Sequence, residues 1–454
     1  MNQNKKIDNK KIIFIVVGII VLVVIGLCFI KALNNTKTSS KTSNNQNSSA
    51  SEISEEYDNK DYGESTDLDG TSITSGGSYN ITGENSCITI NTTKDVELNI
   101  SDASISCTSG PAINVEDAGT VSIVLSGKNK ITSTTTTDLD GAIYSKADLV
   151  FSGDGSLEIT SNYDGIVSKD TLVFKSGTYV ISSDDDGIRG KDNVAIVDGT
   201  FTINSKGDGI KSTNEEDTSK GYIAIDGGIF NITSVTDAIQ AQTDLNINGG
   251  TFVIKTSGNT STYSAKGLKG VNSIEINGGI FNINTTDDGI HSDGDITLND
   301  GTFNITSKDD AIHADGKVEI NGGIYEISAA EGIEATYVKI NDGDINISAS
   351  DDGVNAGNKS NKYSVTVEIN GGNITIKMGQ GDTDGIDSNG NIYIYGGTIN
   401  ITAQSPFDYD GEAKKTGGTI IVNGEETNTI TNQMMGGGDP MNQGNGMNRR
   451  FNRR

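Results

Sequence analysis

An isoleucine follows a turn glycine by four residues at ten places in this chain, and this spacing constrains the fold more than any other feature. Tyr, Phe or Ile stands two residues after each glycine, and apolar residues stand three and five positions before it. Short runs of alternating apolar and polar residues, broken by glycine, are typical of β-strands with one buried face. The ten glycines are Gly177, Gly199, Gly228, Gly250, Gly279, Gly301, Gly323, Gly343, Gly372 and Gly397.

A second motif, Asp-Gly-Ile or a close variant, alternates with these glycine turns. Its isoleucines Ile166, Ile188 and Ile210 are 22 residues apart, and Ile290 and Ile312 repeat the interval. A fixed period of this length with several short strands in each repeat is typical of a solenoid. The sequence therefore predicts one all-β domain, a parallel β-helix whose coils stack about 4.8 Å apart. Right-handed winding is expected, because parallel crossovers almost always have that hand.

Three intervals between turn glycines measure 29 rather than 22 residues, so each contains one coil and seven extra residues. The extra segments are polar, and a shorter insertion, 377–383, precedes Asp384. Loops that project from a stack of coils are common sites of recognition. The long intervals run from Gly199 to Gly228, from Gly250 to Gly279 and from Gly343 to Gly372.

Composition changes sharply outside the repeats. Residues 12–30 form an uninterrupted apolar stretch, long enough to cross a bilayer. Four lysines within residues 1–11 precede it, so we expect a cytoplasmic basic stub, an uncleaved single-pass anchor and an extracellular β-helix over 66–425. A cleaved signal peptide is the alternative. Residues 31–65 are predicted to be a disordered spacer, and 426–454 a disordered Gly-, Asn- and Met-rich tail with a basic end.

Cysteine count and charge exclude two classes of protein. Three cysteines do not make a disulfide scaffold; Cys87 and Cys107 are 20 residues apart, so they are vertical neighbours that form either a disulfide or two buried thiols. A net charge of −27 argues against binding of nucleic acid, because a phosphate-binding face is basic. We expect a monomer.

The aspartates of the Asp-Gly-Ile motif form a column, and several are doubled. Stacked carboxylates repel one another unless a cation lies between them or they form local hydrogen bonds. Calcium takes six to eight oxygen ligands, which paired aspartates on neighbouring coils can supply. An aspartate before glycine is also ordinary turn chemistry. We predict calcium at one or more of the doublets and a turn role for most of the column. The candidate ligands are Asp185, Asp186, Asp208, Asp287, Asp288, Asp309, Asp310, Asp351 and Asp352.

The residue after the motif's isoleucine forms an outward column that is rich in cations. Arg189 is the only arginine before the C-terminal tail, and His291 and His313 are the only histidines in the chain. Zinc does not suit this histidine pair, because neither a cysteine nor a third histidine accompanies it. The column is either a ligand-facing stripe or a row of charges that offsets the aspartates. The candidate carbohydrate-binding residues are Arg189, Lys211, Lys269, His291 and His313.

Six asparagines precede the glycine turns in successive coils. Stacked amides can satisfy one another and the backbone of the bend, so we predict a structural role for this column. Its members are Asn248, Asn277, Asn299, Asn321, Asn341 and Asn370.

One stretch resembles a known family. Ala142 to Leu157 (AIYSKADLVFSGDGSL), followed by Asn162 to Ile166 (NYDGI), is similar to the hallmark of a clostridial cell-surface family of carbohydrate-binding parallel β-helix proteins related in fold to pectate lyases. Leu125 to Ile131 (LSGKNKI) resembles the preceding coil of that family, and the similarity spans 66–425. The resemblance implies a right-handed helix, calcium, and binding of cellulose or of acidic sugars such as polygalacturonate.

Three hypotheses of function follow. The first is a calcium-assisted binding module that holds an acidic polysaccharide or cellulose. The second is a calcium-dependent polysaccharide lyase, which needs a base to remove the proton next to a uronate carboxylate. Lys211, Lys266 and Lys269 are the candidate bases, with Arg189 beside them. The third is a structural or adhesion stalk whose columns serve stability alone.

Overall fold

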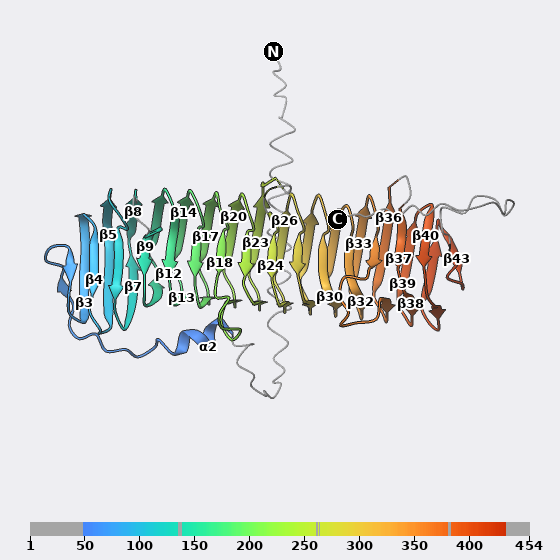
Figure 1. Cartoon of the computed structure of the whole chain (residues 1–454), viewed down its shortest axis with the longest axis horizontal. Coiled ribbons are helices and arrows are strands. Elements are labelled where there is room, and N and C mark those ends of the chain that lie inside the picture. The colour runs from blue at the N-terminus through green and yellow to red at the C-terminus, as the bar shows by residue number, and fades with distance from the viewer. Residues whose placement is uncertain (1–48, 135–138, 260–261, 263, 380–382, 433–454) are drawn as a thin grey trace, which may run out of the picture. The chain divides into compact units, whose positions relative to one another are not determined.

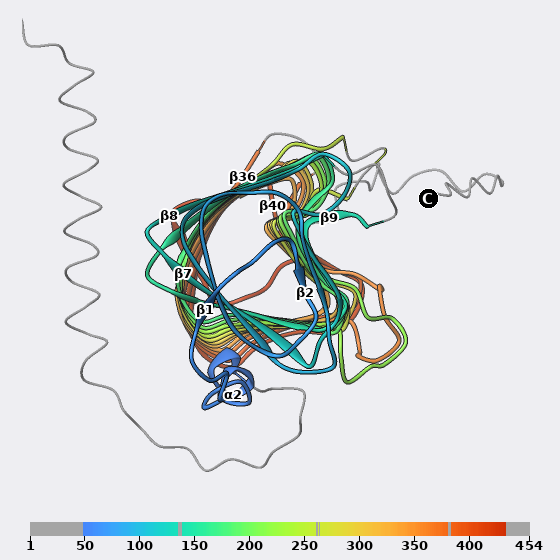
Figure 2. The ribbon, with the colours of Figure 1, turned by 90° about the vertical axis from the view of Figure 1, so that its left-hand side faces the viewer.

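The strands stack into one long, mostly parallel sheet that winds around a common core (Figure 1). The computed structural model describes residues 49–134, 139–259, 262, 264–379 and 383–432. Three ladders of strands run along the stack, and we call them ladders A, B and C. Viewed along the stack, the coils superimpose (Figure 2). The prediction of an all-β solenoid is therefore confirmed.

Ladder A contains the Asp-Gly-Ile strands. It comprises β2 (Ser72–Ile73), β4 (Ile88–Asn91), β6 (Ile113–Asp117), β9 (Gly141–Ser145), β12 (Asp164–Ser168), β15 (Ile188–Gly190), β18 (Ile210–Ser212), β21 (Ile239–Ala241), β24 (Leu268–Gly270), β27 (Ile290–Ser292), the first part of β30 (Ile312–Ile320) and of β32 (Ile333–Ile340), β34 (Val354–Ala356), β37 (Asp384–Ser388) and β40 (Ser405–Tyr409).

Ladder B follows ladder A within each coil. It comprises β1 (Thr66–Asp67), β3 (Gly77–Asn85), β5 (Val96–Cys107), β7 (Thr120–Ser126), β10 (Asp148–Gly153), β13 (Thr171–Phe174), β16 (Asn193–Ile196), β19 (Tyr222–Ile225), β22 (Asp244–Ile247), β25 (Ser273–Ile276), β28 (Asp295–Leu298), the second part of β30 and of β32, β35 (Thr366–Ile369), β38 (Asn391–Ile394) and β41 (Ala413–Lys415).

Ladder C closes each coil. It comprises the ends of β3 and β5, β8 (Lys128–Ser133), β11 (Ser156–Ser161), β14 (Thr178–Ser183), β17 (Thr200–Ser205), β20 (Ile229–Ser234), β23 (Thr251–Thr256), β26 (Ile280–Asn284), β29 (Thr302–Thr306), β31 (Ile324–Ala329), β33 (Asp344–Ala349), β36 (Asn373–Met378), β39 (Thr398–Thr402) and β42 (Thr419–Val422). A last strand, β43 (Glu425–Thr427), pairs antiparallel with β42 and covers its edge.

The predicted columns form the core. Ile166 pairs in register with Ile188, and Ile188 with Ile210, each fully buried. The residues two positions after the glycine turns form a continuous aromatic stack inside ladder C, from Tyr179 to Tyr325, with successive ring centroids 4.6 to 5.0 Å apart. Identical positions in successive coils therefore bury identical side chains, which is why a 22-residue sequence period is sufficient to specify the stack.

Glycine is required at both repeated positions for different reasons. A Cβ atom on Gly187, in the Asp-Gly-Ile motif, would lie 2.5 Å from the Gly209 carbonyl oxygen and 2.5 Å from Cγ2 of Ile203. Gly250, in the turn column, has a φ of +119°, which L side chains rarely adopt. The first glycine allows close approach of coils, and the second allows the bend.

Two structural predictions are confirmed in the turns. The amide of Asn277 donates to the side-chain oxygen of Asn248 at 2.9 Å, and that of Asn299 donates to Asn277 at 2.7 Å. The pattern continues through Asn370.

Cys87 and Cys107 form a disulfide, with Cα atoms 4.9 Å apart, so the pair is oxidised rather than two buried thiols.

The predicted spacer is ordered where the structure describes it. Helix α2 (Ala50–Glu55) begins at a capping box on Ser49 and lies against the outside of ladder B. Ala50 and Ile53 pack on an apolar stripe formed by Val150, Val173, Ala195 and Ala224. The prediction of a flexible spacer underestimated the order of this segment. Burial of only two apolar residues, Ala50 and Ile53, is enough to dock it, and the solenoid provides the apolar surface.

The N-terminal and C-terminal predictions concern other parts of the chain. The apolar stretch 12–30 and most of the tail 426–454 lie outside the described residues. Among the residues that are described, no helix is long and apolar enough to cross a membrane.

Candidate functional site

Ladder A carries the charged columns, and the loops 213–221 and 357–365 leave the stack at the end of its strands (Figure 2). Residues 213–221 and 357–365 connect ladder A to ladder B, whereas the insertions before β24 and β37 connect ladder C to ladder A. The predicted recognition loops therefore border the ladder on which the predicted site residues lie.

The aspartate column caps the backbone of the neighbouring coil. The backbone N–H of Asp186 donates to Oδ1 of Asp164 at 2.9 Å, and that of Asp208 donates to Oδ1 of Asp186 at 2.7 Å. Asp237 and Asp208 repeat the contact at 2.9 Å. The aspartates thus accept hydrogen bonds from backbone N–H groups, as predicted. Each of these N–H groups belongs to the next coil, however, and not to the turn that contains the aspartate.

The second carboxylate oxygen of these aspartates faces the cationic column. Lys211 lies 2.6 Å from Oδ2 of Asp208, and Lys269 lies 3.8 Å from Oδ2 of Asp237. Burial opposes the charge of Lys211, but the carboxylate of Asp208 outweighs it and raises the pKa of this lysine. A lysine held in its protonated form is a poor general base, which argues against Lys211 as a lyase base.

The two histidines continue the same ladder. Nδ1 of His291 lies 2.8 Å from Asp288, and Nδ1 of His313 lies 2.6 Å from Asp310 and 3.0 Å from Glu334. Burial disfavours the imidazolium of His313, yet its hydrogen bonds to the two carboxylates raise its pKa to about 10. The described geometry of the cationic column therefore agrees with a row of charges that offsets the aspartates.

The pKa of His313 gives a pH dependence with a definite sign. The folded state binds this proton more tightly than the unfolded chain, whose histidine pKa is about 6.5, so the stabilisation is complete below pH 6.5. It is lost as the pH rises towards 10. We expect the denaturation midpoint of the chain to fall across this window, and the fall to be smaller in His313→Gln. An unchanged slope in that variant would contradict the assignment.

Lys266 replaces the motif aspartate in the fifth repeat and contacts the predicted calcium doublet of the next repeat, Asp287–Asp288. Its ammonium lies 3.0 Å from Asp287 and 2.7 Å from Asp288, and its side chain is only 13% exposed. Burial lowers the pKa of Lys266, but the two carboxylates, Asp288 above all, more than compensate and raise it. The lysine thus neutralises this doublet and is held protonated, which argues against its role as a base.

Four groups of three possible ligands lie within 4.8 Å of one another among the described residues. Two contain histidine, and the other two are Asp164–Asp185–Asp186 and Asp287–Asp288–Asp309. The predicted ligands Asp208, Asp351 and Asp352 belong to none of these groups. Burial and the neighbouring aspartates raise the pKa of Asp164 to about 7 even though Arg189 opposes the shift. Asp164–Asp185–Asp186 thus has surplus negative charge and the oxygen donors that calcium prefers.

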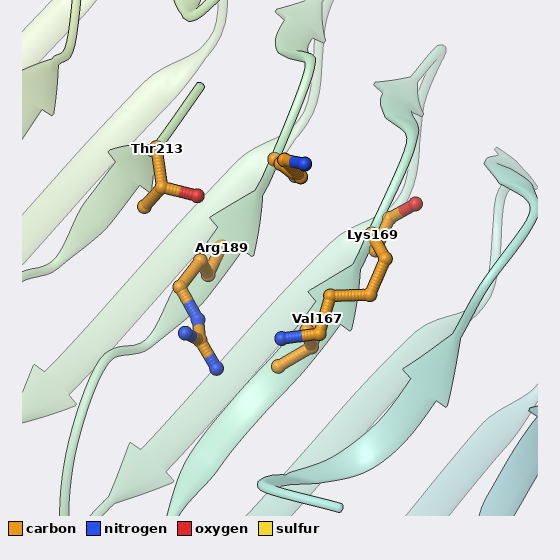
Figure 3. Close-up of a pocket in the computed structure, with 6 residues that line it drawn as sticks. Val167, Lys169, Arg189 and Thr213 are labelled. Atoms are coloured by element: carbon orange, nitrogen blue, oxygen red, sulfur yellow. The ribbon is translucent and has the colours of Figure 1, made fainter. Parts of the chain in front are cut away.

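A basic pocket lies at one end of the cationic column (Figure 3). The cavity, of about 80 Å³, is lined by Val167, Ser168, Lys169, Arg189, Lys191 and Thr213. Arg189 forms ion pairs with Asp140 and Asp164, while its buried Nε atom has no hydrogen-bond partner among the residues that the structure describes. Burial, and then the guanidinium of Arg189, lower the pKa of Lys169. Three cations thus converge on one hollow, and Figure 3 shows Lys169 and Arg189 beside one another.

Lys169 and Lys191 were not among the residues predicted from the sequence. Both stand three residues after the motif's isoleucine, and they are 22 residues apart, so the column was visible in the period. It was missed because the next coil has Thr213 at this position, which breaks the run of charge. Among the five predicted stripe residues, Arg189 is the one that lines this pocket.

A stack of parallel coils with a charged ladder bordered by projecting loops defines a β-solenoid. A family model of carbohydrate-binding domain-containing proteins matches residues 69–311 and 306–435, so the chain belongs to this family. The family resemblance found in the sequence is confirmed. No curated protein matches the chain. The solved polysaccharide lyase-like protein from C. thermocellum, a gadolinium derivative, is 26% identical, with a TM-score of 0.40, over 43% of this chain and 90% of its own.

Proposed function

We propose that this chain binds a polysaccharide that carries carboxylates and that the basic pocket holds one of those carboxylates. The observation that carries the proposal is the convergence of Lys169, Arg189 and Lys191 on one cavity. In a chain with a net charge of −27, an anionic polymer is repelled by most of the surface. The pocket offers charge-assisted hydrogen bonds, which are about twice as strong as neutral ones.

The polymer then extends along ladder A, between the two sets of insertions. Lys211 and both histidines face carboxylates of the protein at 2.6 to 2.8 Å. The pocket lysines, Lys169 and Lys191, have more distant carboxylate partners, at 3.8 and 3.4 Å, so we expect them to contribute more to binding. Repeated weak contacts along a repeating polymer still add avidity. Cellulose, the neutral alternative, brings no charge to the pocket, where Lys169 lies 3.8 Å from Asp140 and Lys191 lies 3.4 Å from the exposed Glu216, and we therefore favour an acidic chain such as a polyuronate.

Calcium is part of the proposal. Asp164, Asp185 and Asp186 fit the ion by their donors and surplus charge, and Asp164 is also an ion-pair partner of Arg189 in the pocket. When bound, calcium neutralises these carboxylates and attracts a uronate carboxylate. Asp287, Asp288 and Asp309 form the second candidate, where the ion competes with the ammonium of Lys266.

The proposed location is the cell surface. Residues 12–30 serve as a single-pass membrane anchor, and the β-helix, wound right-handed, lies outside the cell. Support comes from the apolar stretch with its preceding lysines and from the disulfide between Cys87 and Cys107, since disulfides persist in oxidising compartments.

Affinity gel electrophoresis with polygalacturonate tests the function. The variant Lys169→Met with Lys191→Met should bind about tenfold or more weakly, because each hydrogen bond to a charged group contributes about 1.5–3 kcal/mol. Lys206→Met with Lys255→Met removes the same charge from exposed positions outside the pocket and serves as the matched control. Equal retardation of both variants, or equal retardation of the native chain by neutral dextran, would count against the proposal.

A polysaccharide lyase is the second candidate, and Lys169 is the observation that favours it. A lysine whose pKa is lowered by burial and by an adjacent arginine is closer to a working base than Lys211 or Lys266. Incubation of the native chain with polygalacturonate tests this activity. Absorbance from unsaturated uronides that appears with the native chain and is absent with Lys169→Met would assign it.

A further inference from the structure

Seven successive strands of ladder C, β14, β17, β20, β23, β26, β29 and β31, lie next to one another in the stack (Figure 1). Their outer side is almost free of charge. We call it the ladder C face. Its outward positions carry two charges of opposite sign, Lys255 and Glu326, within a chain of net charge −27. The others are Thr178, Val180, Ser182, Thr200, Thr202, Asn204, Ile229, Asn231, Thr233, Thr251, Val253, Ile280, Asn282, Asn284, Thr302, Asn304, Thr306, Ile324 and Ser328.

This face also gathers exposed apolar side chains. Six large hydrophobic residues are exposed among the described residues, and four of them lie here: Val180 at 43%, Ile229 at 57%, Val253 at 46% and Ile324 at 50%. Ile229 and Val253 lie on the adjacent strands β20 and β23, at the centre of the face, and Val180 and Ile324 lie towards its two ends. Exposed apolar residues that gather on one face, rather than over the whole surface, indicate an interaction site.

One column of the face is β-branched throughout. Ile229 pairs in register with Thr200 and Thr251, and the alternation of threonine with isoleucine continues to Ile324. Stiff branched side chains at strand spacing present a regular row of methyl groups that loses little entropy on packing. The column therefore forms a straight, pre-ordered ridge.

The size of the face matches a protein interface. Six residues of strand span about 20 Å, and seven strands about 4.8 Å apart span about 34 Å. The product, about 680 Å², is close to the roughly 800 Å² that each partner buries in an interface of standard size.

We propose that the ladder C face packs against the same face of a second copy of this chain, related by a two-fold axis. Two copies repel least where neither carries net charge, and the cationic and aspartate columns of ladder A remain outside the contact. The expectation of a monomer was made from the sequence without regard to this face. The proposal does not rest on carbohydrate binding, but a dimer carries two basic pockets and gains avidity for one polymer.

A glycan is the less suitable occupant of the face. Sugar-binding platforms use exposed aromatic rings, and the chain has no tryptophan. The aromatic rings of these seven strands, from Tyr179 to Tyr325, all lie in the core.

Sedimentation equilibrium of the whole chain in detergent tests the proposal. The native chain should dimerise reversibly, and Ile229→Asp with Val253→Asp should raise the dimer dissociation constant at least about tenfold, because charges then face one another in the buried centre. Ser348→Asp with Thr402→Asp adds the same charge to exposed positions of ladder C beyond the face, and it should sediment like the native chain.

Three results would overturn the proposal. The first is a native chain that stays monomeric at about 100 μM, far above the micromolar dissociation constants of ordinary specific contacts. The second is a dimer that survives in the face variant, because another segment then holds it. The third is a face variant that loses binding to a neutral glycan while its mass in solution stays the same. Equal melting temperatures of the two variants establish that the face variant is folded.

Discussion

Replacing Lys266 with alanine is expected to destabilise the solenoid by about 3–5 kcal/mol, the usual cost of removing one partner from a buried ion pair. The ammonium touches Asp287 and Asp288, whose side chains are 12% and 5% exposed, so neither carboxylate can regain full hydration. Chemical denaturation measures the loss. Lys206→Ala is the matched control, because its pair with Asp184 is exposed and contributes about 0–1 kcal/mol.

Calcium should reverse part of that loss. With the lysine gone, Asp287, Asp288 and Asp309 present three carboxylates, of which Asp288 keeps His291 as a neighbour at 2.8 Å. A ligand that binds only the folded state stabilises it by about 2.7 kcal/mol at a hundredfold excess over its dissociation constant. We expect calcium to raise the melting temperature of Lys266→Ala more than sodium chloride does at equal ionic strength. Equal shifts from calcium and from sodium chloride, in the variant and in the native chain, would remove calcium from the proposed function.

The fold was predictable because each coil repeats the same sequence pattern. Turn glycine, inward isoleucine and inward aromatic residue recur in the same order, so the sequence shows both the strands and their register. Helix α2 was not predictable in the same way. Ala50 and Ile53 are isolated in a polar segment, and their partners, such as Val173 and Ala195, lie on strands that are apolar on both faces for no reason visible in the sequence.

The candidate site was predictable by columns but not by contacts. The period placed Arg189, Lys211 and both histidines beside the aspartates, and the structure has them there. It could not show which carboxylate oxygen caps the next coil and which faces a cation, because side-chain direction depends on the rotamer. It also could not show that Lys266 crosses to the doublet of the next coil, since that contact depends on the length of the lysine side chain.

Phe252→Ala is expected to cost about 3–5 kcal/mol, as for other buried phenylalanines. Phe252 is fully buried, with ring centroids 4.6 Å from Phe230 and 4.7 Å from Phe281, so the deletion leaves a gap in the middle of the stack. Lys255→Ala, an exposed change on the same strand, should stay within about 0.5 kcal/mol.

In a stack of coils, the location of the destabilisation is as informative as its magnitude. Each coil contacts only its neighbours, so stability is a sum of coil terms and of interfaces between adjacent coils. Hydrogen exchange of Phe252→Ala should therefore accelerate most in β20, β23 and β26 and least in β39 and β42, which lie several coils away. Uniform acceleration along all coils would mean that the solenoid opens as one unit, and that the aromatic column transmits its stability from end to end.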